Sequence, residues 1–106
     1  MSDERPLFET IMEMTEASVR HADLDDRVLM LVRFAALAAV DAPPASYLLN
    51  MAVAADVGLT LEDAQGVLIA VSPIIGTPRA VAAAGAIAEA LGFAIDLSAE
   101  IEAAGS

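Results

Sequence analysis

Three polar side chains interrupt an apolar stretch in the middle of the chain, where residues 43–50 read PPASYLLN. If a helix begins at Pro44, Ser46 and Asn50 lie four residues apart on one face of that helix, with Tyr47 beside them. A tyrosine hydroxyl can donate a proton or a hydrogen bond, and a serine hydroxyl and an asparagine amide can orient a substrate. Ser46, Tyr47 and Asn50 are therefore the candidate catalytic residues.

Each of these residues also has a structural interpretation that needs no substrate. Near a helix start, the Ser46 hydroxyl caps the helix or bonds to its backbone. Asn50 satisfies a polar contact between subunits, and Tyr47 packs its ring in a core or an interface. The serine has no evident base that would make it a nucleophile. From the residues alone, both interpretations stay open.

Two arginines lie outside the acidic N-terminal region, Arg33 within an apolar segment and Arg79 after a turn. A guanidinium binds a carboxylate through two parallel hydrogen bonds, so both are candidate substrate-binding residues. The alternative for each is an exposed side chain whose stem covers apolar surface. His21, in a polar segment beside acids, is expected at the surface. We predict no metal site and no cofactor.

The elements that must position these groups are predicted to be helices, because apolar residues follow helical spacing along the whole chain. It predicts an all-α fold of five to six short helices, joined by short loops and packed roughly antiparallel. The expected helices cover about residues 1–22, 25–40, 44–55, 60–71 and 78–91, with a short last helix over 98–104. Within the first helix, Leu7, Ile11, Met14 and Ala17 form an apolar stripe opposite the acids.

Local signals mark the helix ends. Asp25 or Asp26 can cap the second helix, and Pro44 suits the first turn of the third. Gly58 is expected to end the third helix.

The later boundaries follow the same logic. Thr60 and Asp63 form a capping box for the fourth helix. Pro73 is expected to stop that helix, and Gly92 to close the fifth, which Thr77 would cap.

A length of 106 residues predicts a single domain over 1–106. The apolar fraction is 58%, above the usual range of about 45–50%. Since a small core cannot bury so much apolar surface, we expect the chain to associate with copies of itself.

The net charge of −11 excludes several classes of partner. There is no lysine, and the field repels phosphate backbones and anionic membranes, so we expect no nucleic-acid or membrane partner. No uninterrupted apolar run reaches the about 18–20 residues of a membrane span, the nearest being 28–40. The acidic start, MSDERPLFE, does not resemble a secretory signal. A cytoplasmic protein is expected.

The chain contains no cysteine. It can therefore form no disulfide, no thiolate nucleophile and no thiolate metal site.

Three segments together carry a resemblance to a known family: LDDRVLMLVRFAAL, PPASYLLNMAVAADVGLTLEDAQGVL and IIGTPRAVAAAGAIAEAL. They resemble the carboxymuconolactone decarboxylase and alkylhydroperoxidase D superfamily over residues 24–92. That superfamily has a helix that opens with CxxCxxxH, then a glycine, a capped helix and a G-x-P turn. VGLTLED and IGTPRAVAA match the last two features. The resemblance implies an alkylhydroperoxidase D-like helical bundle that assembles as a trimer or hexamer.

The family's redox positions are occupied here by other residues. Counting back from Gly58, the first cysteine of the motif falls on Pro43, the second on Ser46 and the histidine on Asn50. The acid that family peroxidases carry about a dozen residues earlier falls near Leu31. A thiol–disulfide cycle needs two sulfurs, so we reject thiol peroxidase activity for this chain.

The decarboxylase branch of the family needs no cysteine pair, and the resemblance implies a small, negatively charged lactone as its substrate. Arg33 or Arg79 would hold the anion, Tyr47 would donate a proton, and Ser46 and Asn50 would orient the substrate.

Two hypotheses follow. The first is a non-peroxidase oligomeric helical protein that binds a small molecule or a partner, or serves as a scaffold. The alternative is a cofactor-free, decarboxylase-like or lyase-like enzyme acting on a small carboxylate or lactone.

Overall fold

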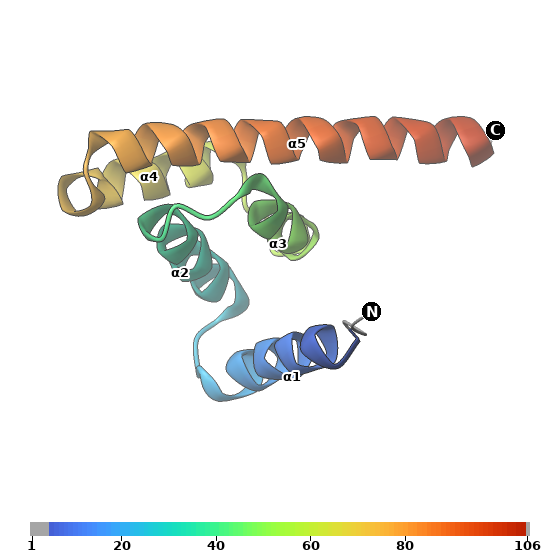
Figure 1. Cartoon of the computed structure of the whole chain (residues 1–106), viewed down its shortest axis with the longest axis horizontal. Coiled ribbons are helices and arrows are strands. Elements are labelled where there is room, and N and C mark those ends of the chain that lie inside the picture. The colour runs from blue at the N-terminus through green and yellow to red at the C-terminus, as the bar shows by residue number, and fades with distance from the viewer. Residues whose placement is uncertain (1–4, 106) are drawn as a thin grey trace.

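The computed structural model describes residues 5–105, which form five α-helices and contain no strand. The helices are α1 (Arg5–His21), α2 (Asp26–Ala39), α3 (Pro44–Asp56), α4 (Leu61–Ile75) and α5 (Thr77–Gly105). Helices α2 to α5 pack on one another as a bundle, with α5 as a long rod along one side (Figure 1). The all-α prediction is confirmed.

The helix starts form as the sequence signals predict. The Asp25 carboxylate accepts a hydrogen bond from the Val28 backbone N–H at 3.0 Å and caps α2. Pro44 occupies the first turn of α3, where its missing N–H removes no helical hydrogen bond. At α4, Thr60 Oγ1 accepts from the Asp63 backbone N–H at 3.2 Å, and Asp63 Oδ2 accepts from the Thr60 N–H at 2.9 Å. This is a complete capping box.

One predicted helix end is wrong because Pro73 does not stop α4. The helix continues to Ile75 and contains Pro73 in its last turn, before Gly76 turns the chain with φ of 90°. A proline inside a helix costs one backbone hydrogen bond and about 3 kcal/mol. Packing of α4 against both α2 and α5 offsets that loss.

A second predicted helix end, at Gly92, is also wrong. Helix α5 runs without a break from Thr77 to Gly105, so the short helix expected over 98–104 is its C-terminal part. Thr77 is its first residue. An interior glycine costs only about 1 kcal/mol relative to alanine, and no proline follows it. The alanine-rich sequence on both sides of Gly92 therefore continues the helix.

The hydrophobic core lies between α2, α3 and α5. Its buried residues are Met30, Phe34, Ala38, Tyr47, Ala54, Ala83, Ile87 and Ala90. The Phe34 and Tyr47 rings stack at 6.0 Å between centroids and 17° between planes. Aromatic pairs of this kind add about 0.5–1.5 kcal/mol beyond the area that they bury. Alanine at half of the positions brings the helices close together.

Helix α1, like α4, contains no buried residue, but unlike α4 it makes no extensive contact with another helix. Figure 1 shows α1 on the side of α2 and α3 that faces away from α5. A polar contact joins it to the bundle, from Arg33 Nη2 to Ser18 Oγ at 3.4 Å. His21, expected at the surface, is the last residue of α1, and it is exposed.

One stretch of α5, Thr77–Asp96, is long and apolar enough to cross a membrane by length and composition, and 11% of it is buried. It passes that test because alanines raise the average hydropathy around Arg79 and Glu89. Apolar helices of helical bundles pass the same test, and α5 packs along α3 and α4. The stretch therefore carries no membrane assignment.

Candidate functional site

Ser46 and Asn50 share one face of α3, as the spacing predicts. Asn50 Nδ2 donates a hydrogen bond to the Ser46 backbone carbonyl at 2.8 Å, and both residues are half-buried. The Ser46 N–H donates to the Pro43 carbonyl at 3.0 Å, within the first turn of the helix. The Asn50 amide thus bonds to its own helix.

Tyr47 is the most deeply buried polar side chain of the three candidates. Its exposed fraction is 0%, its ring stacks on Phe34, and its hydroxyl has no hydrogen-bond partner among the described residues. Burial raises the pKa of Tyr47, and the negative charge of Asp41 raises it further. The hydroxyl therefore stays protonated at neutral pH and remains a potential donor.

The two candidate arginines contact different parts of the protein. Arg33 reaches Ser18 of α1, as described above. Arg79, which is exposed, donates from Nη1 to the Ala39 carbonyl at 2.9 Å. That carbonyl belongs to the last turn of α2, where the helix dipole is negative and favours a cation. Arg79 therefore caps α2.

A third arginine, which the sequence did not single out, joins two elements. Arg27 Nη2 lies 2.7 Å from Asp63 Oδ1, and Arg27 Nη1 donates to the Gly58 carbonyl at 3.2 Å. The Thr60 backbone hydrogen bond, and then the Arg27 side chain, lower the pKa of Asp63. The capping box was evident from local spacing, but no local signal predicts a contact between residues 36 apart in sequence.

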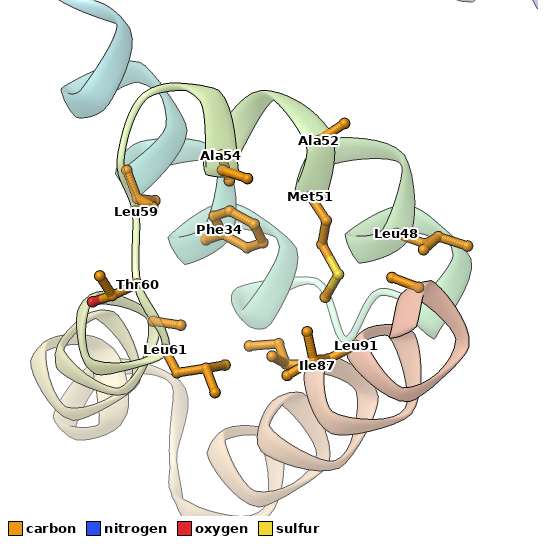
Figure 2. A pocket seen from close by; sticks show the side chains of 13 residues that line it. Phe34, Leu48, Met51, Ala52, Ala54, Leu59, Thr60, Leu61, Ile87 and Leu91 are labelled. Carbon is orange, nitrogen blue, oxygen red and sulfur yellow. The ribbon is translucent and has the colours of Figure 1, made fainter. Parts of the chain in front are cut away.

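A cavity of about 600 Å³ lies between α3, the start of α4 and α5, with Phe34 of α2 at its base. Figure 2 shows Met51 of α3 pointing toward Ile87 and Leu91 of α5. The lining residues are Phe34, Leu48, Met51, Ala52, Ala54, Ala55, Leu59, Thr60, Leu61, Ala64, Ile87, Leu91 and Ala94. All are apolar apart from Thr60, and none is ionisable.

The candidate residues of the sequence analysis do not line this cavity. A helix turns by about 100° per residue, so the lining residues Leu48, Ala52 and Ala55 lie on the face of α3 opposite Ser46 and Asn50. Ala54, four residues after Asn50, also lines the cavity and lies next to the Asn50 side of the helix. Arg33 and Arg79 are absent from its wall as well. The apolar residues that form it follow helical spacing, which in the sequence is indistinguishable from ordinary core spacing.

Comparison with known families identifies the fold. The family model of the carboxymuconolactone decarboxylase family matches residues 5–89. The chain belongs to this family. Searches of curated proteins and of solved structures returned no match. The match confirms the resemblance and extends it from residue 24 back through α1.

This family member lacks the redox cysteines. The chain contains no cysteine, and the positions that spacing predicts for the CxxCxxxH motif hold Pro43, Ser46 and Asn50. No thiolate can therefore be formed from its own residues. What remains on that face of α3 is a hydroxyl and an amide. On the opposite face, α3 provides one wall of an apolar cavity.

Proposed function

We propose that this protein is a non-peroxidase, cytoplasmic member of the carboxymuconolactone decarboxylase family that binds a small apolar molecule in the cavity beside α3. The observation that carries the proposal is the cavity itself. Its volume lies within the range of about 300–1,000 Å³ that is usual for ligand sites. Thr60, at its edge, is the one polar side chain that could orient a ligand.

The chemistry of the wall favours an apolar ligand over a carboxylate. A carboxylate buried without a cation or hydrogen-bond donors loses its hydration with little in return. Apolar burial is worth about 25 cal/mol per Å², so a ligand that buries about 250 Å² gains about 6 kcal/mol before the cost of association. Arg33 and Arg79, the candidate anion-binding groups, contact Ser18 and the end of α2 instead.

Binding of a neutral apolar fluorescent probe, N-phenyl-1-naphthylamine, tests this function. We expect Ala94→Phe, which places a ring in the cavity from α5, to weaken probe binding at least about tenfold. Ala84→Phe is the matched control, because Ala84 is exposed on the same helix and does not line the cavity. If the native protein binds no probe, or if both variants bind it equally well, the proposal is wrong.

A second candidate function is a cofactor-free, decarboxylase-like or lyase-like enzyme that acts on a small carboxylate or lactone. One observation favours it: the Tyr47 hydroxyl is buried and protonated, and it has no hydrogen-bond partner among the described residues. A substrate acceptor could complete that hydrogen bond.

A panel of small organic acids in a thermal-shift experiment tests this candidate. A carboxylate that binds the folded protein raises the melting temperature through mass action. The shift should disappear in Arg33→Ala or Arg79→Ala if either arginine holds the anion. If no acid shifts the native protein, the enzyme hypothesis loses its support.

A further inference from the structure

Helix α1 presents a wide apolar face that its own chain does not cover. Its large apolar side chains are each between 44% and 66% exposed: Leu7, Phe8, Ile11, Met12, Met14 and Val19. At 100° per residue these positions gather on one side of the helix, and Glu9, Glu13 and Glu16 lie on the other. A helix of this pattern normally buries its apolar side, and α1 has no buried residue.

The total surface of the chain is too large for a self-contained monomer. The chain exposes 7436 Å², whereas a folded monomer of 10.9 kDa exposes about 5,600 Å². Its radius of gyration is 15.2 Å, against about 13 Å for a compact domain of this length. The excess of about 1,800 Å² is close to what one subunit contributes to an obligate homodimer interface.

Helix α1 cannot dock in the cavity of its own chain in this arrangement. Helix α1 lies on the far side of α2 and α3 from α5 (Figure 1), and no α1 residue lines the cavity. The acidic polar face also opposes the anionic surface of a membrane. A second copy of the chain, by contrast, offers an apolar groove with exposed Leu61 at its rim.

We infer that the apolar face of α1 docks over the mouth of the cavity of a second copy, so that the cavity is closed only in the oligomer. This is the helix-in-groove mode of recognition, in which anchors follow spacings of three, four and seven residues. Phe8, Ile11 and Met12 have that spacing, and Val19 continues it by seven. The inference rests on the proposed function because both use the same cavity.

Chemical cross-linking between two preparations tests the contact. Since the chain has no cysteine, Ile11→Cys in one preparation and Leu61→Cys in a second, mass-tagged one each carry a single thiol. After mixing and treatment with a short flexible bismaleimide, we expect a heterodimer band at least tenfold stronger than with Glu13→Cys, on the opposite face of α1. Equal bands for the two positions would overturn the inference.

Light scattering provides the second measurement. At micromolar concentration we expect the native protein to be an oligomer, and Ile11→Asp to lower its mass to that of a monomer. Glu13→Gln is the matched control and should leave the mass unchanged. Ile11 lies outside the core, so circular dichroism should show both variants folded. A native protein that is a stable monomer contradicts the inference.

The two proposals can fail separately. Probe binding without the Ile11–Leu61 cross-link would overturn the docking of α1 and leave the ligand site standing. The cross-link without probe binding would overturn the ligand site and leave the interface.

Discussion

The two faces of α3 differ in what they keep of the family's chemistry. One face carries Ser46 and Asn50, the residues that spacing predicts for the redox motif, and the Asn50 amide bonds to the helix's own backbone. The other face carries Leu48 and Ala52 and borders a cavity of about 600 Å³. The comparison teaches that the spacing of a sequence motif and the space available for a ligand are separate properties. Spacing identifies the family, whereas space shows where a ligand fits.

The largest effect is expected at Phe34, because this ring touches both regions. It stacks on Tyr47 and forms the base of the cavity. Phe34→Ala should lower the free energy of unfolding by about 3–5 kcal/mol, as for other buried aromatic truncations. Urea denaturation measures this change. Phe93→Ala, at an exposed position on α5, is the control and should change stability by about 0.5 kcal/mol or less.

If both variants change the free energy of unfolding by a similar amount, Phe34 is not in the core. Phe34 would then not connect the Tyr47 side of α3 with the cavity.

Tyr47 tests whether the polar side of α3 is a working site. A buried hydroxyl without a partner costs about 1–3 kcal/mol. Tyr47→Phe, which removes it, should therefore raise the free energy of unfolding by about 1 kcal/mol. If Tyr47→Phe instead destabilises the protein, the hydroxyl has a partner in the folded protein, and the observation that favours the enzyme hypothesis is lost.

The pH dependence of Tyr47 gives a second test of its burial. Its pKa in the folded protein is raised above the ordinary value of 10.0. The unfolded chain therefore loses this proton first, and stability that is present below pH 10.0 falls as the pH rises through the folded pKa. Tyr47→Phe should show a smaller loss of stability in alkaline urea titrations than the native protein. An identical alkaline profile would show that Tyr47 is not buried.

The rim of the cavity depends on the α4 cap. Thr60→Ala should lower the free energy of unfolding by about 1 kcal/mol, the usual value of a lost N-cap. The pKa of Asp63 is held below its ordinary value of 3.8. Its stabilising contribution is therefore present above pH 3.8 and disappears as the pH falls through the lowered pKa.

Acid titration of stability checks this cap. Asp63→Asn should show a smaller acid-induced loss than the native protein, with Glu62→Gln, an exposed neighbour, as control. If the two variants lose stability equally in acid, the Asp63 carboxylate does not hold the cap.

Local signals in the sequence predicted the helices but not the concavity between them. Asp25, Thr60 and Asp63 act within three residues of their partners, so spacing alone identified their caps. Pro73 and Gly92 were misread because packing along α4 and α5 outweighs the local cost of each residue. The cavity depends on how α3 and α5 approach each other, which no local pattern encodes.

The smallest expected effect belongs to Asn50. Its side-chain amide donates to the Ser46 carbonyl at 2.8 Å. In an α-helix that carbonyl already accepts a hydrogen bond from the backbone N–H four residues later. Asn50→Ala should therefore change the free energy of unfolding by about 0.5 kcal/mol or less. It should also leave the affinity for the apolar probe unchanged, because Asn50 is not one of the residues that line the cavity, whereas Met51→Ala, on the cavity wall, should alter that affinity. Equilibrium titration of both variants with the probe measures the difference. If Asn50→Ala lowers the affinity for the probe as much as Met51→Ala does, the two faces of α3 act as one site. The face that carries Ser46 and Asn50 then takes part in binding.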